Sequence, residues 1–172
     1  MQRDYEWEVI DHPSSGVDKR FDAPRSGARS TTVLVKPVGA AAWIGSFAAP
    51  DPGTRGLSTI VRTPSPQLLC VIERGTGFLV NVRDPDEFEI VPAIGDLDAE
   101  ATFEEVGLLL LARPWTVTAI GADGVRWTTP RISIDGVVLE GTDQGAVIVT
   151  TDPHGEPRSV RLDPLTGAAL GR

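Results

Sequence analysis

The stretch Leu68-Leu69-Cys70-Val71-Ile72 is short, wholly apolar and bounded by the polar residues Gln67 and Glu73. Comparable apolar runs recur at residues 108–112 and 146–149. The starts of the three runs are therefore about 40 residues apart, and a period of this size is typical of β-propeller units of four strands. Because each run is apolar at every position, it predicts a strand that is buried on both faces.

Each apolar run is followed by the same succession of strand patterns, separated by turns rich in Gly, Pro and Asp. Second strands are predicted at 78–82, 116–120 and 159–162, third strands at 88–91, 125–128 and 168–170, and fourth strands at 97–103 and 132–139. Earlier in the chain the match is weaker, with candidate strands at 7–10, 33–35, 42–47 and 57–61. No window shows the sustained apolar spacing of a helix, so the fold class is all-β.

The preferred architecture is a propeller-like array of three to four antiparallel four-stranded units. The predicted units cover residues 31–66, 67–106, 107–144 and 145–172 of a single β domain that spans residues 31–172. An open β-sandwich built from the same strands is the alternative. Residues 1–30 are predicted to form a loosely ordered arm, because they hold two breaker clusters and few apolar residues apart from a short strand at 7–10.

The composition fits a globular protein that works in the cytoplasm. The 172 residues are 41% apolar and 23% charged, and no segment reaches the roughly 18 consecutive apolar residues of a membrane helix. The N-terminus lacks the apolar core of a signal peptide. A single cysteine, Cys70, excludes an internal disulfide and a cysteine zinc site, and its place in the most apolar strand predicts a packing role.

Two turns carry a resemblance to a known family. The segments Ala122-Asp123-Gly124-Val125-Arg126-Trp127 and Leu162-Asp163-Pro164-Leu165-Thr166-Gly167 resemble the blade turns of quinoprotein-type β-propellers, which link a second strand to a third. The chain is also similar to bacterial β-rich proteins that end in such a pair. The resemblance covers about residues 67–172 and implies a propeller-like fold. It implies no pyrroloquinoline quinone, because no cofactor-binding set can be matched, and we expect no cofactor.

Charge is the main clue to partners. The chain has 24 acidic and 16 basic residues and a net charge of −8, and residues 84–112 contain no base at all. Such a field disfavours nucleic acid and favours a basic protein partner. We expect this acidic surface to include Asp84, Asp86, Glu100 and Glu104. The last two are predicted on the solvent-exposed face of one strand. A purely solvated surface is the alternative.

A second candidate contact is an arginine near an aromatic residue. Arg131 follows Pro130 at the start of a predicted strand, and Trp127 lies four residues before it. An arginine beside an aromatic ring is a common interface anchor, so we expect Arg131 and Trp127 to contribute to binding. The alternatives are that Arg131 pairs with a surface acid and that Trp127 belongs to the core.

No set of residues in the sequence predicts catalysis. His154 lies in the loop Thr151-Asp152-Pro153-His154-Gly155, but no serine has the spacing of a nucleophile elbow. The acids near Asp84 lack the spacing of a known calcium loop, so no metal ligand is predicted. We therefore expect a non-catalytic, protein-binding module, for example an immunity-type antagonist of a basic toxin or nucleic-acid enzyme. A small hydrolase or carbohydrate-active protein with its site near His154 is the alternative.

Overall fold

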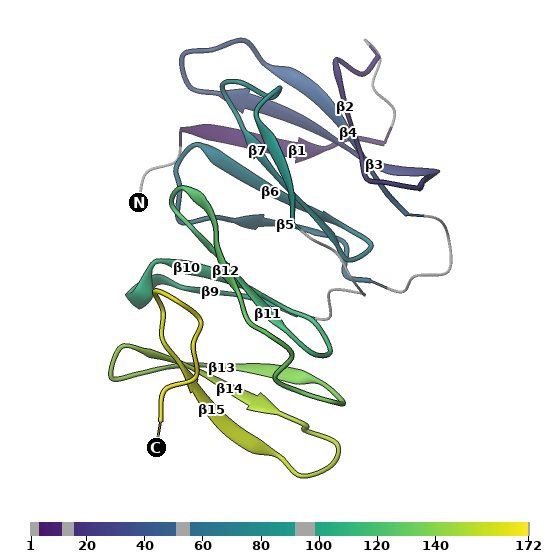
Figure 1. Cartoon of the computed structure of the whole chain (residues 1–172). Helices are drawn as coiled ribbons and strands as arrows, with labels where there is room; N and C mark the ends of the chain where they lie inside the picture. The colour runs from purple at the N-terminus through teal and green to yellow at the C-terminus, as the bar shows by residue number, and fades with distance from the viewer. Residues whose placement is uncertain (1–3, 12–15, 51–55, 92–98, 172) are drawn as a thin grey trace. The chain divides into compact units, whose positions relative to one another are not determined.

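A computed structural model describes residues 4–11, 16–50, 56–91 and 99–171. The regular structure of these residues is β-strand, apart from a single turn of 3-10 helix, so the protein is all-β as predicted (Figure 1). The strands form four small sheets. The chain divides into two compact units: unit 1 comprises residues 1–61 and 66–94, and unit 2 comprises residues 62–65 and 95–172.

The first sheet of unit 1 has the strand order β1-β3-β4-β2. Its strands are β1 (Tyr5–Val9), β2 (Lys19–Asp22), β3 (Ser26–Pro37) and β4 (Trp43–Pro50). Strands β1, β3 and β4 pair antiparallel, whereas β2 pairs parallel to β4 at the edge. This sheet is therefore mixed rather than a simple meander.

The second sheet of unit 1 follows chain order, β5-β6-β7-β8. Its strands are β5 (Thr59–Arg62), β6 (Leu68–Glu73), β7 (Thr76–Asn81) and β8 (Phe88–Val91). The two-residue turn between β6 and β7 consists of Arg74 and Gly75, both at positive φ (43° and 81°). Two positive φ values are what a tight hairpin with right-handed strand twist requires.

Aromatic rings join the two sheets of unit 1 in one core. Phe21 of β2 stacks on Phe47 of β4 at 4.5 Å between ring centroids, and Phe47 meets Phe78 of β7 edge-on at 5.6 Å. The Trp43 indole Nε1 donates to the Val82 carbonyl at 2.9 Å, so its one polar group is satisfied inside the core. Burial of these apolar faces is the main source of stability for unit 1.

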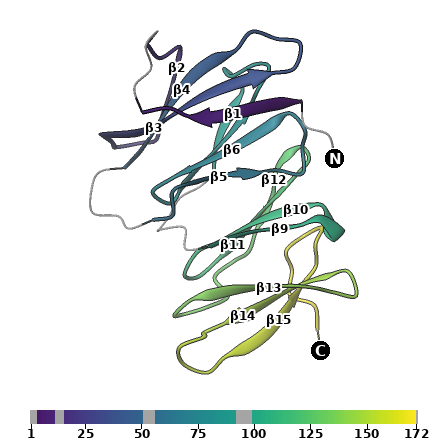
Figure 2. The same cartoon turned by 180° about the vertical axis from the view of Figure 1, so that it is seen from behind.

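Unit 2 also contains two sheets, of orders β12-β11-β10-β9 and β13-β14-β15 (Figure 2). The strands are β9 (Ala99–Phe103), β10 (Leu108–Ala112), β11 (Val117–Gly121), β12 (Gly124–Thr128), β13 (Val137–Asp143), β14 (Ala146–Thr151) and β15 (Arg158–Leu162). Their shared core includes Leu108 and Leu110 of β10 with Val147 and Val149 of β14. Every pair of neighbouring strands is antiparallel.

The prediction that the apolar runs are buried on both faces is confirmed for β10, in which all five residues are buried, and for β6, in which all but the first are. The three runs lie in three different sheets, as β6, β10 and β14. Each run is the second strand of its sheet in chain order. In that position it has a hydrogen-bonded strand on each side. The apolar residues of β6 and β10 reflect burial of both faces of these strands, because a central strand of an antiparallel sheet can also keep one face in solvent.

The predicted boundaries of the repeat units are shifted by one strand. Strand β9, expected as the fourth strand of the unit 67–106, instead pairs with β10 of the next sheet, with Phe103 opposite Leu108. The short 3-10 helix η1 (Glu104–Val106) and Gly107, at a φ of 62°, turn the chain directly from one strand to the other. A tight turn joins neighbours in the same sheet more readily than it separates them. β13 pairs with β14 in the same way.

The prediction of a loosely ordered arm at residues 1–30 is wrong for most of its described part. β1 pairs with β3 along its full length, from Tyr5 opposite Pro37 to Val9 opposite Val33. Tyr5, Phe21 and Ala23 are buried in the core of unit 1. The segment has few apolar residues, and Trp7, Val9 and Val17 among them are exposed, but three others occupy core positions, which average composition does not reveal.

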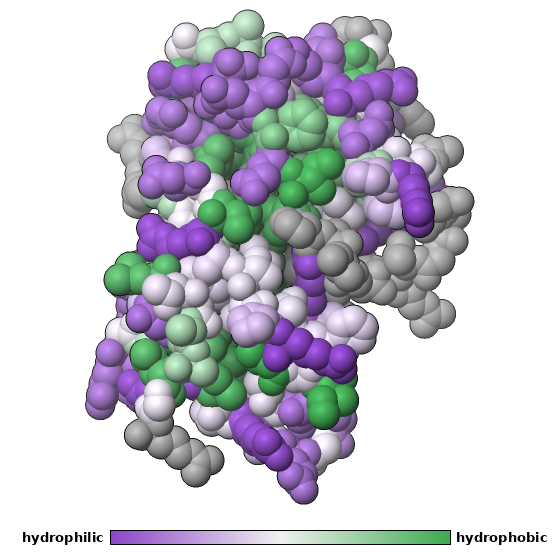
Figure 3. Space-filling view, in the orientation of Figure 1, coloured by the Kyte–Doolittle hydropathy of each residue, from purple (hydrophilic) through white to green (hydrophobic). Residues whose placement is uncertain are grey.

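Hydrophobic side chains on the face drawn in Figure 3 form separate patches among hydrophilic ones. The described residues include ten exposed large hydrophobic side chains, among them Trp115, Ile134 and Leu165. Scattered exposed apolar residues are normal, so only a group held in a defined geometry indicates a binding surface.

Candidate functional site

The antiparallel order of unit 2 gathers three connections at one end of its strands. They are the β10–β11 hairpin turn (residues 113–116), the β12–β13 connection (129–136) and the β14–β15 loop (152–157). Hydrogen bonds join them: Ile132 donates its backbone N–H to the Trp115 carbonyl at 2.9 Å, and Asp152 donates to Gly136 at 3.1 Å. Residues distant in sequence therefore meet here.

Trp115 and Arg131 form the most defined exposed contact at this end. The Arg131 Cζ lies 5.1 Å from the centroid of the Trp115 ring, which places the cation over the aromatic face. The Trp115 side chain is 43% exposed, and its Nε1 donates to the Ile134 carbonyl at 3.1 Å. The ring is thus fixed in orientation although much of it remains open to solvent.

Asp152 holds the connection that carries Arg131 and Ile134. Its Oδ1 accepts hydrogen bonds from the Ile134 N–H (2.6 Å), the Ser133 hydroxyl (2.9 Å) and the Asp135 N–H (3.2 Å). These donors stabilise the carboxylate and lower the pKa of Asp152, with the Ile134 N–H as the largest cause. Ile134, 75% exposed, is presented to solvent from this braced segment.

Trp115, Arg131 and Ile134 together are called the Trp115 surface below. The Arg131 Nε donates to the Ser133 carbonyl at 3.1 Å. Among the described residues, no carboxylate forms an ion pair with Arg131, so the alternative of an arginine paired with a surface acid is wrong within that set. The surface combines apolar area with a cation whose position is fixed.

The aromatic ring that contacts Arg131 belongs to Trp115, whereas the sequence predicts Trp127 for this role. Trp127 is buried in the core of unit 2, and its Nε1 donates to the Pro164 carbonyl at 2.9 Å. A contact role for the Trp127 ring is therefore wrong, and the core alternative holds. The signal for Trp115 was its place after Pro114 in a turn between two apolar strands, where a large aromatic residue has no core to enter.

The acidic residues predicted as one docking surface belong to different units. Asp84 and Asp86 lie in the β7–β8 turn of unit 1, where the Asp86 N–H donates to the Asp84 carboxylate at 3.3 Å. Asp86 also forms an ion pair with Lys19 at 2.6 Å. Asp84 thus has a local role in the turn, and Asp86 already pairs with a cation.

Glu100 and Glu104 lie in unit 2, but the prediction that they share one strand is wrong. Glu100 is in β9 opposite Leu111, whereas Glu104 begins the 3-10 helix η1 after the strand has ended at Phe103. Glu104 is exposed and Glu100 is half-buried. Asp96 and Asp98 of the same acidic segment lie outside the described residues. An acidic docking surface stays a prediction.

The residues near His154 do not form a hydrolytic triad. His154 is exposed and has no hydrogen-bond partner within the described ranges. Asp152, its neighbour in sequence, directs its carboxylate to the 133–135 segment instead. Ser133 lies beside that aspartate but is only 3% exposed, and its hydroxyl contacts a carboxylate rather than a histidine. A serine so placed lacks the base that activates a nucleophile.

Arg113, in the turn that carries Trp115, is a buried cation that sequence reasoning missed. Its side chain is 6% exposed, and in the described part of the chain its Nε has no hydrogen-bond partner. Burial lowers the pKa of Arg113, because a charged group loses hydration there.

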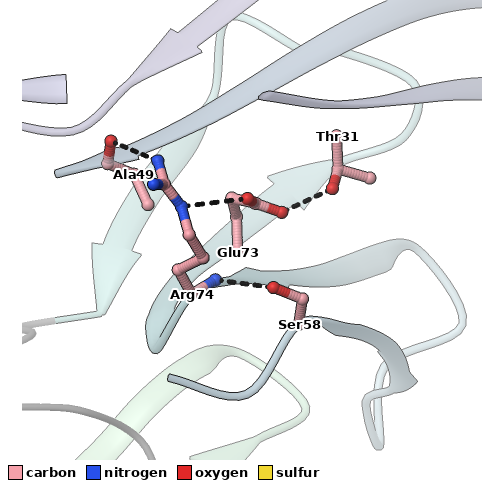
Figure 4. A network of polar contacts seen from close by, with 5 residues as sticks. All are labelled: Thr31, Ala49, Ser58, Glu73 and Arg74. Atoms are coloured by element: carbon pink, nitrogen blue, oxygen red, sulfur yellow. Dashed lines mark hydrogen bonds and ion pairs between the residues drawn. The ribbon is translucent and has the colours of Figure 1, made fainter. Parts of the chain in front are cut away.

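A second buried charge lies in unit 1 and has a structural role (Figure 4). Arg74 Nε lies 3.3 Å from Glu73 Oε1, and the Arg74 Nη2 donates to the Ala49 carbonyl at 3.2 Å. The other Glu73 oxygen accepts a hydrogen bond from the Thr31 hydroxyl, and the Arg74 N–H donates to Ser58 Oγ at 2.9 Å. The pair fixes the β6–β7 turn against both neighbouring segments.

Two comparisons of the sequence with known proteins gave no match. No model of a known protein family matches the chain, and no curated protein matches it. In the described residues, no three His, Cys, Asp or Glu side chains come together as metal ligands. Likewise, no helix among these residues is long and apolar enough to cross a membrane.

Proposed function

We propose that this protein is a non-catalytic binding module whose partner is a protein that docks on the Trp115 surface. The observation that carries the proposal is the stacking of Arg131 on Trp115, with a ring that is both exposed and held in place by the Ile134 carbonyl. Tryptophan and arginine, together with tyrosine, are the residues enriched at the energetic centres of protein interfaces.

The rigidity of the surface supports binding rather than mere solvation. The hydrogen bonds of Asp152 to three successive residues fix the segment before a partner arrives. A surface ordered in advance loses little conformational entropy on association, so more of its contact energy appears as affinity. Ile134, whose carbonyl accepts from the ring Nε1, adds an exposed apolar side chain, and covering an exposed isoleucine on association is favourable.

The net charge of −8 supports a partner that is basic overall. Opposite net charges accelerate encounter, while the short-range contacts of the Trp115 surface would determine how long the complex lasts. An antagonist of a basic toxin or nucleic-acid enzyme fits this combination. The hydrolase alternative has less support, because Ser133 is buried and bound to an aspartate.

Site-specific photo-crosslinking tests the proposal. A photoreactive amino acid replaces Ile134 in one variant and Leu165 in a control, since Leu165 is similarly exposed (68%) but follows the opposite end of β15. Each variant is irradiated in a lysate of the native host. We expect a protein adduct at position 134 that is absent at position 165 and is lost when Trp115→Ala is added. Equal adducts at both positions would contradict docking on the Trp115 surface.

A further inference from the structure

We infer that Arg131 is a receptor for a carboxylate, so the partner presents an aspartate or glutamate side chain next to an apolar one. The inference deepens the proposed function and depends on it only for the source of the carboxylate. Its basis is that the Trp115 ring and the Ser133 carbonyl restrain the guanidinium of Arg131, while its two terminal nitrogens remain available as hydrogen-bond donors.

Two contacts hold the guanidinium group in place. Its carbon lies over the Trp115 ring at 5.1 Å from the centroid, and its Nε donates to the Ser133 carbonyl at 3.1 Å. The Ser133 carbonyl is itself positioned, because the Ser133 hydroxyl donates to Asp152. Stacking and one hydrogen bond together restrict the rotation of a side chain that is otherwise highly mobile.

The terminal nitrogens Nη1 and Nη2 have no hydrogen-bond partner among the described residues. Two N–H groups in a fixed plane match the two oxygens of a carboxylate, which accepts them as a pair of parallel hydrogen bonds. The carboxylate of this network, Asp152, is already engaged by the Ile134 and Asp135 N–H groups and by Ser133. Within the described ranges, therefore, no acid of the chain pairs with Arg131.

The apolar neighbours define the rest of the recognised group. The Trp115 ring lies under the cation, and Ile134, whose carbonyl accepts from the ring Nε1, adds an exposed apolar side chain on the same connection as Arg131. Neither side chain offers a second charge. An acidic residue flanked by an aliphatic one satisfies both parts of the surface, whereas a phosphate leaves the apolar part uncovered. Contact with apolar groups also excludes water and strengthens the ion pair.

Nuclear magnetic resonance on the full ¹⁵N-labelled chain tests the inference through the Nε–Hε signal of Arg131, assigned by its loss in Arg131→Lys. The probes are N-acetyl-Leu-Asp-amide, its neutral counterpart N-acetyl-Leu-Asn-amide, and inorganic phosphate at equal ionic strength. Arg126 is the internal control, because it is an exposed arginine of the same unit with no ion pair among the described residues.

We expect the Asp probe to shift the Arg131 signal saturably and to leave Arg126 unmoved. The Asn probe should bind about tenfold more weakly, because hydrogen bonds to an ionised acceptor are roughly twice as strong as neutral ones. Trp115→Ala should weaken the Asp probe about threefold or more, through loss of the stacking. Equal binding of the two dipeptides, equal shifts at Arg126, or tighter binding of phosphate would overturn the inference.

The carboxylate receptor and the docking of a protein partner can fail independently of each other. If a captured partner binds wild type and Arg131→Gln equally well, docking on the Trp115 surface stands and the carboxylate receptor is wrong. If the Asp probe binds at Arg131 as expected but no partner crosslinks at position 134, the receptor stands and the docking proposal is wrong.

Discussion

The indole ring of Trp127 lies directly against the backbone of Gly167. A Cβ added to Gly167 would come within 2.5 Å of ring atom Cε3, and the Trp127 Nε1 donates to Pro164 in the same turn at 2.9 Å. Trp127 belongs to β12 and the turn follows β15, so this contact joins the two sheets of unit 2. Gly167 also adopts a φ of 70°, which a residue with a side chain seldom takes up.

Gly167→Ala should lower the free energy of unfolding by about 2–4 kcal/mol, because it adds a steric clash to an unfavourable backbone conformation. Gly145→Ala separates the two causes: Gly145 has a φ of 79° but open space around its Cβ position. That control should cost only about 1 kcal/mol. Denaturant titrations of both variants measure the difference, and equal losses would show that the Trp127 contact is not tight.

Leu110→Ala should lower the free energy of unfolding by about 2–5 kcal/mol, since it opens a cavity in a strand buried on both faces. Leu165→Ala is the matched control, because Leu165 is exposed and should change stability by no more than about 0.5 kcal/mol. A loss below about 1 kcal/mol for Leu110→Ala would place β10 outside the core.

Ionisation of Tyr5 should make the free energy of unfolding of unit 1 depend on pH in the alkaline range. Burial, with a further contribution from Cys70, raises the pKa of Tyr5 to about 12. Between pH 10, where an unfolded tyrosine ionises, and about 12, the unfolded chain has lost a proton that the folded chain keeps. The free energy of unfolding should therefore fall across this window, and less steeply in Tyr5→Phe.

The absorbance of tyrosinate reports this pKa directly, because the chain has a single tyrosine. A titration midpoint near 12 is expected for the folded protein. A midpoint near the ordinary value of about 10 would mean that the Tyr5 hydroxyl, which donates to the Leu68 carbonyl at 2.9 Å, is open to solvent.

Arg113→Met should raise the free energy of unfolding by about 1–3 kcal/mol, because it removes a buried charge without a carboxylate partner among the described residues. Arg126→Met, at an exposed position, should change stability by about 0.5 kcal/mol or less. Thermal and denaturant melts of both variants provide the comparison. Destabilisation by Arg113→Met would show that the guanidinium makes a favourable contact in solution.

The sequence predicted the strands of the fold better than their grouping. The apolar runs at β6, β10 and β14 were recognisable because almost all residues of β6 and β10, and most of those of β14, are buried. The assignment of β9 to its sheet depends on the turn through η1 and Gly107, whose geometry leaves no periodic signal in the sequence. The order β1-β3-β4-β2, with its parallel edge pair, arises from tertiary packing of Phe21 and is likewise invisible in local patterns.

Arg131 could be singled out from the sequence, but its neighbours could not. The nearest aromatic residue in the chain, Trp127, is in the core, and the one in contact, Trp115, is brought there by the antiparallel return of β11 and β12. The support from Asp152, at 18 residues from Ile134 in the chain, follows from the β14–β15 loop. Such contacts depend on topology rather than on spacing.

The decisive measurement for the Trp115 surface is the dissociation constant of the captured partner for Trp115→Ala, with Trp7→Ala as the control. Trp7 is a partly exposed tryptophan of unit 1 that lies outside the Trp115 surface. Isothermal titration should show at least tenfold weaker binding for Trp115→Ala, since truncation of an interface hot spot costs about 2 kcal/mol or more, and unchanged binding for Trp7→Ala. Equal dissociation constants for wild type and Trp115→Ala, with both proteins folded, would contradict the assignment of the Trp115 surface as the binding site.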